Sequence, residues 1–144
     1  MKTSVQRILV PIDLTDSSIA AVDYAVKLAQ PLQATLTLLY IVEPPVVNER
    51  ATLDEQLQNF ARLFVPGNVP IELVVGEGKP LEQILGEVRE MNPDLIVMVS
   101  RPGAAPRHWF RRPRSMTAEL LRGTACPVVV LRDNEPALSD YAFL

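Results

Sequence analysis

The chain has 144 residues and a mass of 16.0 kDa, which is the size of one domain. Hydrophobic residues make up 48% of it and charged residues 22%, so a wholly disordered chain is excluded. The net charge of −3 argues against a general nucleic-acid binder. Because Cys126 and His108 are the only cysteine and the only histidine, the sequence offers little basis for a structural zinc site or a Ser-His-Asp enzyme.

The first half of the chain alternates between predicted strands and helices. Residues 8–12 are apolar and branched, which predicts a buried strand with Pro11 near its end. Helix N-cap residues crowd 13–18, and the helix that follows is expected to stop near Gln30-Pro31. A second strand is predicted over 36–42. The second helix shows its apolar spacing over 53–64, with Thr52 and Glu55 at the spacing of a capping box.

The second half continues the alternation. A third strand is predicted over 71–75, followed by a turn at Gly76-Glu77-Gly78 and a helix with Pro80 in its first position, which Asn92-Pro93 ends. The run 95–99 is apolar on both faces and predicts a central strand. A fourth helix is expected from near Ser115 to Arg122 with Gly123 as a left-handed cap, then a final strand over 127–131.

Strict alternation of strands and helices predicts an α/β fold, a three-layer open parallel sheet of about five strands with about four helices. Ligands of such sheets bind at the carboxyl ends of the strands, where the strand order reverses. The loops after each strand are therefore the places to look for a site. We assign 1–132 to this domain and 133–144 to a C-terminal tail or docking segment.

One loop concentrates positive charge on an otherwise acidic chain. Residues 101–114 hold five arginines and no acidic residue, so the rest of the chain carries 9 − 17 = −8. Arginine binds phosphate or carboxylate groups bidentately, which suits either a nucleotide or an acidic protein partner. A solvated surface loop is an equally good interpretation of the charge, although Trp109-Phe110 favours a contact.

Five segments together resemble the universal stress protein family. They match in order and spacing over roughly 5–132, and they are 8–13 with Ser17-Ser18, 36–44, 76–84, 94–98 and 126–130. The resemblance implies a flavodoxin-like or Rossmann-like sheet with strand order 3-2-1-4-5. It also implies dimers, often paired through the last strand. Some members bind ATP or AMP in the cleft between strands one and four, and others bind no nucleotide.

The resemblance also assigns candidate roles to single residues. Asp13 falls on the position that contacts the adenosine part of the nucleotide, and Val42 falls where the backbone meets adenine. The phosphate loop departs from the family pattern, because Val99, Pro102 and Arg114 stand where nucleotide-binding members carry glycine. Glycine lets backbone N–H groups approach phosphate, and proline removes a donor. Gly103 and Ser115 remain as remnants of the motif.

Each candidate residue also has a structural interpretation. Asp13 suits a ribose or adenine contact as well as it suits the stabilisation of a helix N-terminus. Ser115 suits a phosphate contact or, more simply, an N-cap. We expect His108 at the surface, because no partner for a general base is evident. We expect Cys126 to be a small buried residue rather than a nucleophile.

The favoured hypothesis is a regulatory module that binds an adenine nucleotide, ATP or AMP, with Mg²⁺ accompanying ATP, and that has negligible turnover. Slow ATP hydrolysis stays open. The alternatives are an interaction protein without nucleotide, which docks an acidic partner through 101–114 or the tail, and a small nucleotide-handling enzyme. The candidate binding residues are Pro11, Asp13, Val42, Ser100, Arg101, Gly103, Arg107 and Ser115.

Two expectations concern the surroundings of the protein. The final strand, 128–131, is apolar and is expected at a sheet edge, where unpaired backbone groups invite a second copy and form a homodimer. The N-terminus lacks the pattern of a signal peptide, and no apolar run approaches the ~20 residues of a membrane span. We therefore expect a cytoplasmic protein with no membrane partner and no specific nucleic-acid partner.

Overall fold

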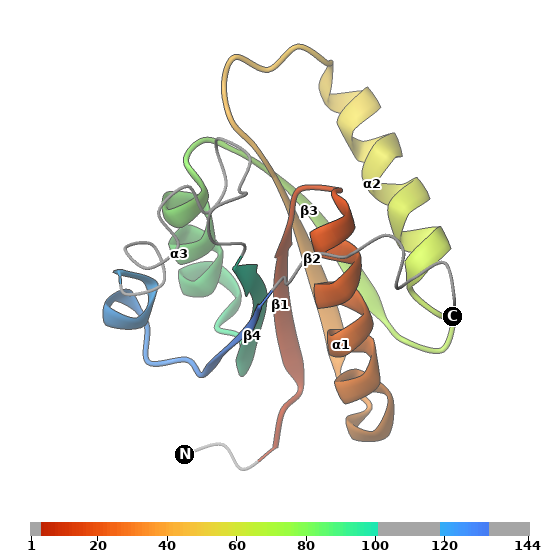
Figure 1. Cartoon of the computed structure of the whole chain (residues 1–144), viewed down its shortest axis with the longest axis vertical. Coiled ribbons are helices and arrows are strands. Elements are labelled where there is room, and N and C mark those ends of the chain that lie inside the picture. The colour runs from red at the N-terminus through yellow and green to blue at the C-terminus, as the bar shows by residue number, and fades with distance from the viewer. Residues whose placement is uncertain (1–3, 101–118, 133–144) are drawn as a thin grey trace.

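The computed structural model describes residues 4–100 and 119–132 (Figure 1). Strands and helices alternate from the start of the chain, as the sequence predicts. The elements are β1 (Arg7–Ile12), α1 (Asp16–Leu32), β2 (Thr35–Val42), α2 (Arg50–Phe64), β3 (Ile71–Glu77), α3 (Pro80–Met91), β4 (Leu95–Ser100) and β5 (Val128–Arg132). Residues 119–123 are also helical, at the end of the fourth predicted helix.

The five strands form one sheet in the order β3-β2-β1-β4-β5, and every pairing is parallel. This confirms the predicted fold class and strand order. The order reverses between β1 and β4, because the chain builds outward from β1 to β3 and then returns to place β4 on the other side. β4 lies between β1 and β5, as its apolar sequence predicts, and β5 lies at a sheet edge.

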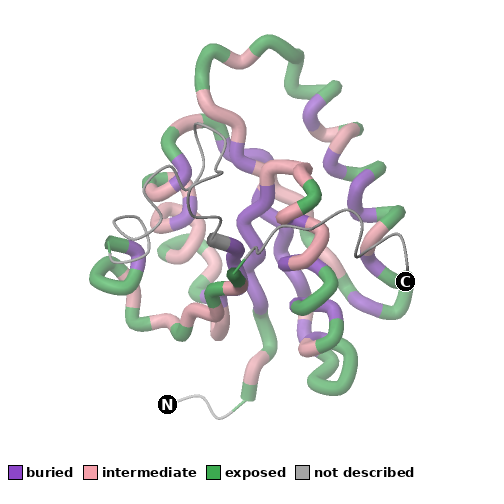
Figure 2. Tube along the Cα trace, viewed as in Figure 1, coloured by how far each residue is buried: buried purple, intermediate pink, exposed green. Residues whose placement is uncertain are grey.

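Two apolar cores lie on opposite faces of the sheet. The helices α1 and α2 cover one face, and α3 with the helical residues 119–123 covers the other (Figure 1). Strand side chains alternate between these cores, so that Ile8 and Val10 join the first and Leu9 joins the second. Burial is densest along the central strands, as Figure 2 shows.

The end of α1 differs from the prediction, because the helix continues through Pro31 and ends at Leu32. Proline in the last turn removes one intrahelical hydrogen bond, and the chain compensates just beyond it. Gln33 adopts a left-handed φ of 56°, and the Ala34 N–H donates to the Ala29 carbonyl at 3.0 Å. This backbone cap satisfies a carbonyl that the helix end would otherwise leave unpaired.

The start of α2 also differs, because no Thr52/Glu55 capping box forms. The helix begins at Arg50 after Glu49, and the Thr52 N–H donates to the Glu49 carbonyl within the first turn. Thr52 therefore lies inside the helix and not at the N-cap position. The Arg50 side chain contacts the Val75 carbonyl of β3, so a contact distant in sequence accompanies the earlier start.

Three smaller predictions change as well. Gly76 and Glu77 belong to β3, and only Gly78, with φ of 146°, forms the turn. Gly123 is helical and has no left-handed φ; a Cβ there would lie 3.0 Å from a Leu85 methyl, so its small size serves close helix packing. Cys126 is half-buried rather than buried. The start of the fourth helix and the tail, 133–144, lie outside the described residues.

Candidate functional site

The strands β1 and β4 part toward their carboxyl ends. Their register joins Ile8 to Leu95 and Leu9 to Ile96 and goes no further. Beyond that point the register continues from β1 to β2 on one side and from β4 to β5 on the other, up to Ser100 and Arg132. The sheet therefore opens at the position where the strand order reverses, which is where open parallel sheets bind ligands.

Asp13, the first residue after β1, organises the turn at this opening. Its Oδ1 accepts hydrogen bonds from the Thr15 N–H at 3.1 Å, the Thr15 hydroxyl at 2.5 Å and the Ser18 hydroxyl at 2.9 Å. The Ser18 hydroxyl accepts in turn from the Asp13 N–H at 3.0 Å. Ser18 is buried in the first turn of α1, so the carboxylate and the helix start form one unit.

This network gives Asp13 the structural role that the sequence left open beside ligand binding. All three bonds converge on Oδ1, and Oδ2 accepts none from the residues that the structure describes. A half-buried carboxylate with one oxygen committed to its own turn keeps the other for a hydroxyl or amine donor. Leu14 takes a left-handed φ of 65° within this turn, a conformation that costs a leucine about 1–2 kcal/mol.

Val42 ends β2 beside this turn. Its carbonyl accepts a hydrogen bond from the Gly78 N–H at 3.0 Å, which ties the β3–α3 turn to the end of β2. A carbonyl oxygen has a second lone pair, so this contact does not consume its capacity to accept. The carboxamide of Gln83 lies against Gly76 and Gly78, and a Cβ on either glycine would come within 3 Å of it. The backbone here is packed closely by its own side chains.

Tyr40 is a neighbour of Asp13 that the sequence did not single out. It pairs with Ile12 in the register of β1 and β2, and its hydroxyl lies 3.4 Å from the Gln56 Oε1 of α2. Burial, and then the negative charge of Asp13, raise the pKa of Tyr40. The phenol therefore stays protonated as a donor near the opening. The proximity of Tyr40 to Asp13 follows from the pairing of β1 with β2, which the sequence does not show.

The other predicted site residues divide into two groups. Pro11 is buried in β1 opposite Leu39, and Ser100 ends β4, so the topology brings both to the same edge of the sheet as Asp13 and Val42. Arg101, Gly103, Arg107 and Ser115 lie outside the described residues, as do His108 and the aromatic pair Trp109-Phe110. Ser100 is the last described residue before the gap.

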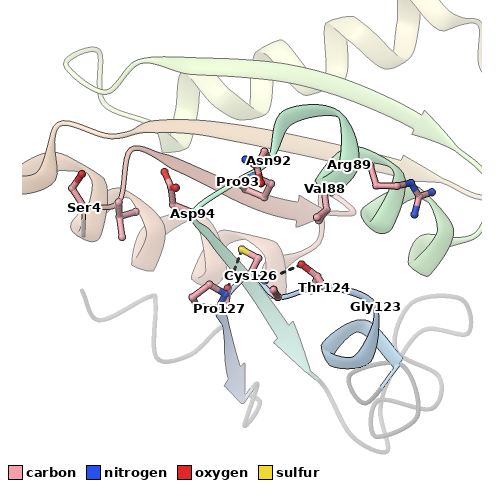
Figure 3. A pocket seen from close by; sticks show the side chains of 12 residues that line it. Ser4, Val88, Arg89, Asn92, Pro93, Asp94, Gly123, Thr124, Cys126 and Pro127 are labelled. Atoms are coloured by element: carbon pink, nitrogen blue, oxygen red, sulfur yellow. Dashed lines mark hydrogen bonds between the residues drawn. The ribbon is translucent and has the colours of Figure 1, made fainter. Parts of the chain in front are cut away.

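A second hollow lies at the opposite, amino end of the sheet. It is open, with a volume of about 830 Å³, and it is lined by residues just before β1, by the end of α3 with the turn into β4, and by 123–127 (Figure 3). The Cys126 thiol lies 3.4 Å from the Pro127 carbonyl here, and its N–H donates to the Thr124 hydroxyl at 3.0 Å. Burial, and then the Asp94 charge, raise the pKa of Cys126 to about 11. The thiol is therefore a poor nucleophile at neutral pH.

Neither a metal site nor a membrane-spanning helix is found in residues 4–100 and 119–132. There, His, Cys, Asp and Glu side chains form no group of three or more that could hold a metal ion. Within the same ranges no helix has the length and apolar character needed to span a bilayer.

Comparison with solved structures identifies the same fold in proteins of one family. The universal stress protein UspA from Lactobacillus plantarum superposes with a TM-score of 0.66 at 24% identity, covering 91% of this chain and all of that one. A universal stress protein in complex with cAMP gives a TM-score of 0.66 at 23% identity, with 90% and 98% covered. The protein from Archaeoglobus fulgidus in complex with dAMP gives 0.64 at 14%, with 87% and 96% covered.

Sequence comparison agrees with the fold. Universal stress protein YxiE from Bacillus subtilis (strain 168) is 26% identical over 147 aligned positions, which cover 88% of this chain and 98% of YxiE. The universal stress protein family model matches residues 4–132, nearly the whole chain. The sheet order, the opening between β1 and β4 and these matches lead to one conclusion: the chain belongs to the universal stress protein family.

Proposed function

We propose that this universal stress protein is a stress-response module that binds an adenine nucleotide at the carboxyl ends of β1 and β4. The observation that carries the proposal is the opening itself: β1 and β4 stop pairing after Leu9 and Ile96, and Asp13 follows β1 at that opening. Two proteins with this fold were solved with cAMP and with dAMP, which supports an adenine nucleotide as the class of ligand.

The described residues fit the nucleoside half of such a ligand. The Asp13 Oδ2 would accept hydrogen bonds from ribose hydroxyls, and the Val42 backbone would meet the adenine edge beside buried Pro11. Phosphate groups would then extend toward Ser100 and the following segment, where Arg101, Gly103, Arg107 and Ser115 are the candidates. Arginines would replace the backbone N–H groups that the missing glycines leave unavailable.

ATP and AMP are both candidate ligands, and Mg²⁺ would accompany ATP. Mg²⁺ in nucleotide sites is held largely by phosphate oxygens and water, so it does not require a protein cluster of carboxylates. We propose a binding role without significant turnover, because in the described part of the site the Asp13 Oδ2 would be occupied by ribose hydroxyls and the Tyr40 phenol stays protonated. Neither group is poised to activate a water molecule.

We also propose a cytoplasmic homodimer that pairs through β5. The Ile96 N–H donates to the Pro127 carbonyl, so the backbone groups of Pro127 point toward β4. Backbone groups alternate sides along a strand, so those of Val128 and Val130 point away from β4. Val130 is 39% exposed at this edge. An apolar edge strand with outward backbone groups suits a second copy of the same strand.

A second candidate function has its own supporting observation. The Oδ1 of Asp13 is fully engaged by Thr15 and Ser18, and the Val42 carbonyl already holds the Gly78 N–H. A family member that lost nucleotide binding would keep such contacts for stability alone. It would then act as an interaction protein whose 101–114 segment or tail docks an acidic partner.

Calorimetric titration with ATP, ADP, AMP and cAMP decides between the two functions. Binding of any of these with an affinity in the micromolar range supports the first, and no heat from any of them at millimolar concentration refutes it. Asp13→Ala should weaken all the nucleotides about equally, by about tenfold or more, since a hydrogen bond to a charged group contributes roughly 1.5–3 kcal/mol.

A charge-matched control keeps that result interpretable. Asp16→Ala removes an exposed carboxylate three residues away without touching the Asp13 network, so it should leave affinity unchanged. Arg107→Ala should weaken ATP more than AMP, because AMP carries one phosphate. Equal losses for both would contradict a phosphate role for that arginine.

A further inference from the structure

One arginine, Arg50, meets the outer side of β3, the strand at one end of the sheet. Arg50 is the first residue of α2, which runs beside β3 (Figure 1). Its Nη2 donates to the Val75 carbonyl at 3.3 Å, its Nη1 lies 3.9 Å from the Glu77 carboxylate, and its Nε lies 3.5 Å from Asp54. One guanidinium thus contacts the backbone of β3 and two carboxylates.

The direction of the Val75 carbonyl follows from its neighbours. The Leu36 N–H donates to the Pro70 carbonyl, and the Gly78 N–H donates to Val42, so residues 70 and 78 direct their backbone groups toward β2. Backbone groups alternate sides along a strand, so the odd-numbered residues of β3 point the other way. Within residues 4–100 and 119–132 no strand pairs with that side of β3, so the Val75 carbonyl lies on the outer edge of the sheet, where Arg50 contacts it.

The sequence of β3 makes that edge a hazard. Residues 71–75 read Ile-Glu-Leu-Val-Val, a run with high strand propensity and one charge. A free strand of this kind offers a template on which a second copy can pair. Proteins protect such edges with charged side chains that an incoming strand would have to displace.

We propose that Arg50 guards the β3 edge against pairing with β3 of a second copy of this chain. An incoming strand would need the Val75 carbonyl, and it would have to desolvate the guanidinium and separate it from Glu77 and Asp54. These side chains are about half exposed, so each ion pair is weak by itself. The protection of the β3 edge depends on the three contacts of Arg50 together. It leaves strand pairing between copies to other edges.

Arg50→Ala is the direct test, with Arg62→Ala as the matched control. Both remove one positive charge from an exposed arginine of α2, but Arg62 lies in the last turn. In sedimentation, Arg50→Ala should form species about twice the mass of the wild-type assembly as concentration rises, because pairing two β3 edges joins two assemblies. Arg62→Ala should sediment like the wild type.

Amide exchange identifies the edge involved. The outward N–H groups of Leu73 and Val75 should exchange more slowly in concentrated than in dilute Arg50→Ala, and by at least fivefold. Larger species without this protection would overturn the proposal, as would an Arg50→Ala protein that sediments like the wild type at every concentration.

A second variant covers the case in which Arg50→Ala does not fold. Arg50→Lys keeps the charge and the aliphatic stem, but one ammonium group cannot reach Val75, Glu77 and Asp54 together. It should give the same β3 protection at higher protein concentration. A folded Arg50→Lys protein that shows no concentration-dependent protection, beside an unfolded Arg50→Ala protein, would mean that Arg50 serves stability alone.

Discussion

The two ends of the β1–β4 pair are held in different ways. At the amino end, the Asp94 carboxylate accepts hydrogen bonds from the N–H groups of Gln6 at 2.8 Å and Arg7 at 2.9 Å. The Asp94 N–H donates to the Arg7 carbonyl, and the Arg7 guanidinium donates to the Met91 carbonyl. At the carboxyl end, the Asp13 bonds stay within its own turn and α1.

If the proposed nucleotide site is correct, this difference separates stability from binding along one pair of strands. The hydrogen bonds at the amino end join segments that are more than 80 residues apart in the chain, so they stabilise the fold as a whole. At the carboxyl end β1 and β4 are not paired, and under the proposed function the nucleotide would lie between them. The Asp94 variants test this division directly and have the largest expected effect, and two further measurements examine the amino end.

Asp94→Ala should lower the free energy of unfolding by about 2–3 kcal/mol, because two backbone N–H groups lose a charged acceptor. Asp94→Asn keeps an acceptor oxygen without the charge, so it should lose about half as much. Urea denaturation measures both. Nucleotide affinity should stay unchanged in the folded fraction, and a loss of affinity larger than that of Asp13→Ala would break the proposed separation of the two ends.

Cys126 reports on the hollow at the amino end. With a pKa of about 11, its thiol should react with iodoacetamide at pH 8 at least tenfold more slowly than the same thiol in urea. The rate should keep rising up to about pH 11. The protonated thiol's contribution to the free energy of unfolding is complete below its unfolded pKa near 9 and is lost as the pH rises to about 11. A rate that levels off near pH 9 would show an ordinary, solvated thiol.

Gln33 gives the smallest effect, at the amino edge where α1 turns into β2. It adopts a left-handed φ of 56° and is exposed, so Gln33→Gly should raise the free energy of unfolding by about 0.5–1 kcal/mol. Asn92 has a similar φ of 50° after α3, but asparagine tolerates this conformation better. Asn92→Gly should therefore gain less in the same thermal or urea measurement, and an equal gain would argue against this explanation.

The success of the sequence predictions depended on how local their signals were. The helix α3 begins at Pro80 and is followed by Asn92-Pro93, as predicted, because a proline at N1 and a left-handed asparagine act within a few residues. The helix α1 ends at Leu32, one residue beyond the predicted Gln30-Pro31, and the Thr52/Glu55 capping box predicted at the start of α2 does not form. There, a backbone cap beyond Pro31 and the contacts of Arg50 with β3 outweighed the local propensities.

The candidate site shows the same limit. The topology rule placed Asp13, Val42 and Ser100 at one edge of the sheet, and the structure places them there, with Pro11 one residue before the end of β1. The rule gave no sign of Tyr40, which reaches the Asp13 region through the register of β2 with β1. It also gave no sign that the Asp13 Oδ1 is engaged by Thr15 and Ser18, since either interpretation of that carboxylate fitted the sequence.

The amino-acid sequence by itself determined the alternation of strands and helices, the parallel sheet and the family, because apolar periodicity and turn residues act over short stretches of chain. The tertiary structure alone decided where β1 and β4 part, how Asp94 joins them, and which edge carbonyl Arg50 covers. Those features arise from contacts between segments 25 to 88 residues apart, whose geometry no local pattern encodes.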